Sequence, residues 1–178
     1  MRRPTTSTPA GLRRAIAESV DAARAEDADR FAEAATRLAA QDPQRLVLVQ
    51  SGVIRSLLED LHPDGLSGAD AQDLLRRCLT WAVSWYPRAD PRVLVLTGAL
   101  GLDDGGTAPA ASDDAAEPAA SEDSGEVGPV SAAPDPVAPS EGAALLIADL
   151  LSAAGAPLTG YLDAALAELE RAETIELP

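Results

Sequence analysis

The stretch DADRFAEAATRLAAQDP, residues 27–43, indicates the fold class of this chain. Its apolar residues recur at spacings of three and four, which places them on one face of a helix; they are Ala28, Phe31, Ala32, Ala35, Leu38 and Ala39. Arg30 and Arg37 fall on the opposite face. Asp42-Pro43 then ends this helix and begins another, because proline is tolerated at a first helical position. The stretch therefore predicts two consecutive helices, the first of them amphipathic.

The same periodicity predicts helices on both sides of this stretch. They cover residues 11–25, 43–61, 67–86, 143–154 and 158–172, and His62–Gly65 is a turn signal between two of them. Residues 92–100 contain VLVLT, which alone suits a strand, but no second strand could pair with it. A short buried helix is therefore predicted there. The predicted fold class is all-α, a compact bundle of about seven short helices.

Residues 103–141 interrupt the helical pattern. They contain ten acidic residues, six prolines and no arginine, and their only large apolar residues are Val127, Val130 and Val137. Such a segment cannot bury enough apolar surface to offset the ordering of its backbone, about 1–2 kcal/mol per residue. The sequence therefore predicts a long, disordered acidic loop.

This interruption sets the predicted domain organisation. The parts are a frayed N-terminus (1–10), a five-helix main body (11–102), a disordered acidic linker rich in proline and alanine (103–141), two helices (142–173) and a tail (174–178). The two C-terminal helices hold too little apolar surface to fold alone. We expect them to dock on the main body, with docking on another chain as the alternative.

Composition excludes several classes of function. The chain has 178 residues, 29 acidic and 14 basic, with a formal net charge of −15. This charge argues against a nucleic-acid partner, and the absence of lysine removes the phosphate-binding and Schiff-base lysines. One cysteine and one histidine exclude a disulfide framework and multi-cysteine zinc sites. No cofactor is predicted.

The expected location is the cytoplasm. No apolar run approaches the ~20 residues that a membrane span needs, so no membrane partner is predicted. The N-terminal residues MRRPTTSTPAGLRRA lack the apolar core of a secretory signal.

Trp81, Trp85 and Tyr86 are the candidate binding residues. They are three of the five aromatic residues of the chain, and they lie within six positions. Trp81 and Trp85 are four residues apart and so share one side of a helix. They form either an aromatic patch that anchors a partner or ligand, or part of the core. Trp81 is displaced from the apolar stripe of this helix, and we expect it to be the more exposed tryptophan.

Two further groups offer chemistry with a structural alternative. Asp60, His62 and Asp64 could hold a divalent metal or act as acid and base, or they could form a helix C-terminus and a turn. Cys78 could be a nucleophile if His62 lay beside it, or a small buried hydrophobe. The structural alternative is favoured for both, and no catalytic or metal-binding residue is predicted.

The arginine pairs and the acidic linker also allow either a binding role or a structural role. Arg76-Arg77 beside Asp73 and Arg13-Arg14 beside Glu18 could bind an anion or form pairs within their helices, and the latter is favoured. The acidic linker could imitate a polyanion or act as a solubilising spacer, and the spacer is favoured.

These observations predict a non-enzymatic helical module that interacts with a protein partner or with itself. Amphipathic helices are abundant, and no catalytic constellation accompanies them. The alternative is a small-molecule receptor or sensor with an apolar pocket between helices, near Trp81, Trp85 and Val93.

Overall fold

The computed structural model describes residues 8–89 and 139–175, and within them the chain is all-α, as predicted. The helices are α1 (Pro9–Arg24), α2 (Ala28–Ala39), α3 (Pro43–Leu61), α4 (Gly68–Trp85), α6 (Pro139–Ala154) and α7 (Leu158–Ile175). The helix predicted over 92–100 and the linker up to residue 138 lie outside the described residues.

Local signals account for where these helices begin. The side chains of Thr8, Asp27, Asp42 and Ser67 each accept a hydrogen bond from a backbone N–H of the first turn. The predicted start of α3 at Asp42-Pro43 is confirmed. At α4, the Asp70 carboxylate also accepts from the Ser67 backbone N–H at 3.1 Å, which completes a capping box.

The start of α6 differs from the prediction. The helix begins at Pro139, so residues 139–141 belong to it and not to the predicted linker, which ended at Glu141. Proline is suited to a first helical turn, where its missing N–H leaves no bond unmade, and acidic residues are common in that turn. The acidic residue and the proline that suggested a linker are therefore features of a helix N-terminus.

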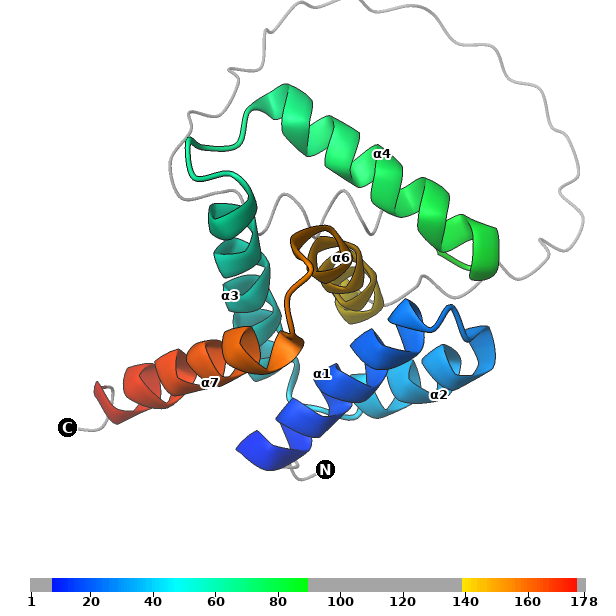
Figure 1. Cartoon of the computed structure of the whole chain (residues 1–178). Coiled ribbons are helices and arrows are strands. Elements are labelled where there is room, and N and C mark those ends of the chain that lie inside the picture. Colours follow the sequence, from blue (N-terminus) through cyan, green and yellow to red (C-terminus); the bar gives the residue numbers. More distant parts are fainter. Residues whose placement is uncertain (1–7, 90–138, 176–178) are drawn as a thin grey trace, which may run out of the picture.

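Helix α6 is the centre of the bundle. It contacts α1, α2, α3 and α4, and it is surrounded by them in Figure 1. Its buried residues cover every side of the helix; they are Gly142, Ala143, Ala144, Leu145, Leu146, Ile147, Ala148, Leu150 and Leu151. A helix that is apolar all round needs an apolar environment on every side, and the four neighbouring helices provide it here. No helix in the described part of the chain has the length and apolar content for a membrane span.

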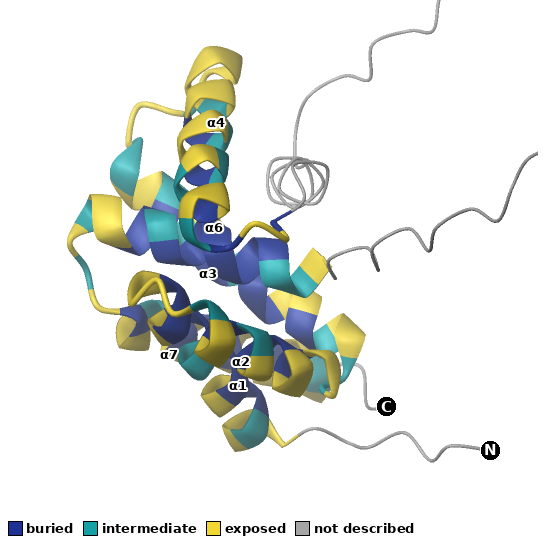
Figure 2. Cartoon of the chain, turned by 90° about the vertical axis from the view of Figure 1, so that its right-hand side faces the viewer, coloured by how far each residue is buried: buried dark blue, intermediate teal, exposed yellow. Residues whose placement is uncertain are grey.

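Helix α4 lies over α6 with less of its surface buried. Its buried residues are Leu74, Cys78 and Ala82, and its outer side is largely exposed (Figure 2). The ion pair between Arg77 and Asp149 of α6, at 2.8 Å, adds to this contact. The carboxylate of Asp149 is only 12% exposed, so the arginine compensates a charge that is largely removed from water.

Helices α3 and α7 cross closely at a glycine. A Cβ atom at Gly52 would lie 3.3 Å from the Cβ of Ala165. The two small residues therefore allow a close approach of the backbones. Tyr161 of α7 also donates a hydrogen bond to Asp60 of α3 at 2.7 Å, and Arg45 pairs with Glu173 at 2.7 Å.

Candidate functional site

The three candidate aromatic residues lie together with a fourth. Phe31 of α2 contacts Trp85 and Tyr86 edge-on, with ring centroids 5.5 and 5.0 Å apart. Trp85 lies 5.6 Å from both Trp81 and Tyr86. We call Phe31, Trp81, Trp85 and Tyr86 the aromatic cluster. Edge-on pairs of this kind contribute about 0.5–1.5 kcal/mol beyond the area they bury, so the cluster attaches the end of α4 to α2.

Trp81 is hydrogen-bonded to the turn between α1 and α2. It is partly buried against the core, and its indole Nε1–H donates to the Glu26 carboxylate at 2.9 Å. Glu26 follows α1 with φ of 54°, a left-handed backbone conformation that is usual for glycine. The turn between α1 and α2 thus brings a carboxylate to a residue 55 positions away.

Trp85 and Tyr86 lie deeper in the cluster. Tyr86 is buried, and its hydroxyl group lies 3.4 Å from Oε2 of Glu141 in the first turn of α6. The indole nitrogen Nε1 of Trp85 is buried and has no hydrogen-bond partner among the described residues. The aromatic cluster thus connects α4 to both α2 and α6. The Nε1–H of Trp85 remains without an acceptor among the described residues.

Burial dominates the electrostatics at this end of α6. It raises the pKa of Glu141, while the hydrogen bond from Tyr86 and the charge of Arg88 lower it by less. The pKa of Tyr86 is also raised, first by burial and then by the nearby Glu141 charge. Folding therefore favours the protonated form of Glu141.

Glu141→Gln should stabilise the protein at neutral pH and leave it unchanged in acid. Because the folded pKa exceeds the unfolded one, the native state binds the proton more tightly, and stability falls as pH rises through this range. The gain at pH 7 should stay below about 1 kcal/mol, because the carboxylate is only partly buried. Urea unfolding at pH 7 and at about pH 3.5, below the ordinary glutamate pKa, checks this.

Glu168→Gln, on the exposed side of α7, is the control and should show no comparable change between the two pH values. A less stable Glu141→Gln protein at pH 7 would mean that the Tyr86 hydrogen bond outweighs the cost of burial.

Cys78 occupies the buried side of α4, as the favoured interpretation expected. Burial, with a smaller contribution from Asp149, raises the pKa of its thiol from 9.0 to about 12, against the opposing charge of Arg77. The thiolate is the reactive form of cysteine. A thiol that stays protonated at neutral pH is a poor nucleophile.

Cys78 should react with Ellman's reagent at pH 8 about a thousandfold more slowly than an exposed thiol, because so little thiolate forms. Urea should restore ordinary reactivity. A Cys78→Ala, Gly68→Cys protein supplies the exposed reference, since a side chain at Gly68 meets nothing within 4 Å. Rapid reaction of native Cys78 would show that α4 leaves the body readily.

His62 and Asp60 have separate structural roles. His62 caps α3, with its N–H donating to Leu58 and its carbonyl accepting from Gly65. The Asp60 carboxylate accepts from Tyr161 instead. No group of three metal-ligand residues occurs in the described chain.

Arginine pairing is mixed. Arg76 pairs with Asp73 within α4 at 2.6 Å, as expected. For Arg13-Arg14 and Glu18, pairing within the helix was expected. Arg13 instead bonds Asp163 of α7 at 2.7 Å, and Glu18 bonds Arg37 of α2 at 2.9 Å. Neighbouring helices offer these side chains better partners than their own helix does.

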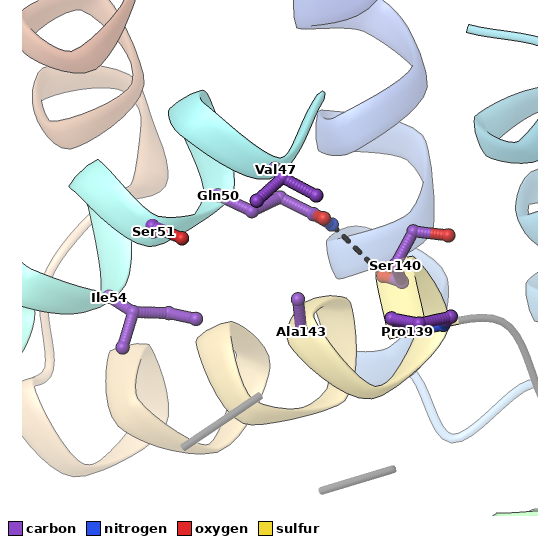
Figure 3. Close-up of a pocket in the computed structure, with 7 residues that line it drawn as sticks. All are labelled: Val47, Gln50, Ser51, Ile54, Pro139, Ser140 and Ala143. Atoms are coloured by element: carbon purple, nitrogen blue, oxygen red, sulfur yellow. Dashed lines mark hydrogen bonds between the residues drawn. The ribbon is translucent and has the colours of Figure 1, made fainter. Parts of the chain in front are cut away.

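An apolar surface on α3 was absent from the sequence predictions. Val47 and Leu48 are 41% and 53% exposed, and a hollow of about 20 Å³ lies beside Val47. Figure 3 shows its lining from two helices: Val47, Gln50, Ser51 and Ile54 from α3, and Pro139, Ser140 and Ala143 from α6. The available signal was the apolar face of α3, which is wider than one contact with α6 needs.

Other concave surfaces lie along α4. One of about 370 Å³ lies where the end of α3 meets the start of α4, and it includes His62, Asp70 and Arg77. Another lies along the outer side of α4 and includes Trp81. Val93, expected near the tryptophans, lies outside the described residues.

Comparison with known proteins gives no further guide to this surface. The chain matches no protein-family model, no curated protein and no solved structure.

Proposed function

We propose that the chain is a non-enzymatic protein-interaction module that binds an amphipathic helix of a partner protein on the outer side of α3. One observation carries this proposal: two large apolar residues, Val47 and Leu48, are exposed next to each other beside an apolar hollow. Exposed apolar groups that surround a small recess are typical of protein-binding surfaces.

The spacing of this surface favours a helix as the partner. Gln44, Val47, Leu48, Ser51 and Leu58 follow the spacing of one helix side. Helices pack by fitting the side chains of one between those of another. Residues 43–58 contain no acidic residue in a chain of net charge −15, so this stretch differs from the rest of the molecule.

The hollow limits which residue the partner inserts. Its volume of about 20 Å³ accommodates one methyl group. Gln50 donates to the carbonyl of Ser140 at 2.9 Å across its edge, so this amide is already hydrogen-bonded and the remaining lining is largely apolar. We therefore expect an alanine side chain to fill this hollow better than a leucine side chain.

The test uses fluorescently labelled synthetic amphipathic helices of about five turns. They differ only at the central residue of the apolar stripe, which is glycine, alanine or leucine. Fluorescence anisotropy should show tightest binding for alanine. Val47→Ser with Leu48→Ser should weaken that binding at least about tenfold, equivalent to 1.4 kcal/mol.

Val83→Ser on α4 is the matched control, because Val83 is exposed to a similar extent at 43%. It should leave binding unchanged. Equal binding to the wild-type and α3 variants, or equal loss in the control, would refute the assignment to this surface. Absence of binding by all three peptides would refute the helical partner.

A small-molecule receptor is the second candidate, supported by the buried Trp85 Nε1–H that has no acceptor among the described residues. An apolar ligand with one carbonyl group could satisfy this donor. A panel of aromatic ketones should then raise the melting temperature of the wild-type protein and not of Trp85→Phe. Equal shifts, or no shift, would contradict this candidate.

A further inference from the structure

We propose that the C-terminal segment containing α6 and α7 is exchangeable, and that it can dock on α1–α4 of a second copy of the chain. The exchanged dimer would use the contacts already present in the monomer. The proposal concerns another surface than the outer side of α3 and goes beyond the function proposed above.

The first observation is that this pair makes a complete interface with the preceding helices. Helix α6 contacts all of α1, α2, α3 and α4, and α7 contacts α1 and α3. Polar contacts follow the same division; they are Arg13–Asp163, Arg45–Glu173, Gln50–Ser140, Asp60–Tyr161, Arg77–Asp149 and Tyr86–Glu141. All of them join residues before position 90 to residues after position 138.

The second observation is the length of the connection compared with the distance it must bridge. Tyr86, near the end of α4, lies 3.4 Å from Glu141 in the first turn of α6. Neighbouring helices in bundles are commonly joined by about 2–8 residues. Here 49 residues, 90–138, lie between the two described parts. At full extension they would reach about 160 Å, far beyond a single copy of this body.

Connection length sets the balance between docking within one chain and docking between two. The interface is the same in both cases, so the difference lies in the effective concentration that the connection provides. For a flexible chain this concentration falls roughly as the −3/2 power of length, which is about 30-fold between five and 49 residues. Exchange is therefore far less disfavoured than in a bundle with short loops.

Charge makes the exchange sensitive to salt. Residues 90–138 contain ten acidic residues and one arginine. An exchanged dimer brings two such segments, each of net charge −9, close to the same pair of bodies. Their repulsion weakens as the Debye length falls from ~10 Å at 0.1 M salt to ~3 Å at 1 M. Dimer formation should therefore increase with salt.

The experiment detects exchange by a disulfide between two full-length chains. Gly52→Cys is placed in one chain and Ala165→Cys in the other, both with Cys78→Ala. A Cβ atom added at Gly52 would lie 3.3 Å from the Ala165 Cβ, close to the separation that a disulfide requires. Each chain carries one cysteine, so a heterodimeric bond formed above the level of random collision shows that α7 of one chain crosses α3 of the other.

The chains are unfolded together in urea and refolded by dilution at about 0.5 mM, a concentration that favours docking between chains. They are then oxidised in glutathione buffer at low and high salt. A second sample mixes the chains already folded. The expected result is a heterodimer that increases with salt. A heterodimer in the refolded sample alone still supports the proposal and shows that exchange is slow.

Two controls define the outcomes. Both cysteines in one chain should give an intrachain disulfide, which confirms the geometry independently of exchange. Gly68→Cys paired with Ala165→Cys measures random collision, because nothing lies within 4 Å of a side chain at Gly68. If the Gly52 and Ala165 pair gives no more heterodimer than this control at any salt concentration, the proposal is wrong. Peptide binding to α3 is unaffected by either result.

Discussion

Phe31→Ala should lower the free energy of unfolding by about 3–5 kcal/mol, as large-to-small changes of buried aromatic residues do. The ring is fully buried and contacts both Trp85 and Tyr86. Removing it leaves a cavity and also ends both edge-on contacts between α2 and α4. Because α4 buries only three of its own residues, it depends on this contact more than the other helices would.

Urea unfolding followed by circular dichroism measures the loss of stability. Tryptophan emission provides a second measurement, since both tryptophans belong to the aromatic cluster. Emission in the folded state should shift to longer wavelength as water reaches Trp85. Tyr161→Ala is the control: Tyr161 is only partly buried and lies outside the cluster, so tryptophan emission should not change.

A cost below about 1 kcal/mol with unchanged emission would contradict a structural role for the cluster. This outcome would indicate that Trp81, Trp85 and Tyr86 keep their arrangement without a contact to α2. The expected result does not decide whether Trp81, Trp85 and Tyr86 also bind a partner, and that role stays a prediction.

The helices could be predicted because their signals are local. Asp42-Pro43 and Ser67 determine where α3 and α4 begin through hydrogen bonds that span three residues. The predicted start of α6 was wrong for a related reason. A proline and an acid suit both a linker and a first helical turn, and only the apolar residues that follow distinguish the two.

The candidate site depended on contacts that no local pattern encodes. Trp81 was expected to be the more exposed tryptophan, but its hydrogen bond to Glu26, 55 residues earlier in the chain, was not predicted. Glu26 reaches it from a turn of left-handed conformation. Arg13 similarly finds Asp163 rather than Glu18. Such pairings arise from helix packing, which periodicity in one helix does not specify.

The exposed surface on α3 also could not be predicted from the periodicity of one helix. The apolar residues of α3 cover a wide face that includes Val47, yet Val47 remains 41% exposed. Helices α6 and α7 cover other sides of α3, as Gln50 and Gly52 show by their contacts. Periodicity identifies an apolar side but does not tell how many neighbours are present to cover it.

Leu151→Ala should lower the free energy of unfolding by about 2–5 kcal/mol, because it opens a cavity in the central helix. Leu151 is fully buried in α6, which contacts four other helices and so has little freedom to collapse around a void. Leu48→Ala is the matched control: the same atoms are removed at a side chain that is 53% exposed, and the expected change is within about 0.5 kcal/mol. Urea unfolding of both variants gives the comparison. Similar losses in the two proteins would mean that α6 is not the centre of the core, and the exchange of α6 and α7 between chains would lose its basis.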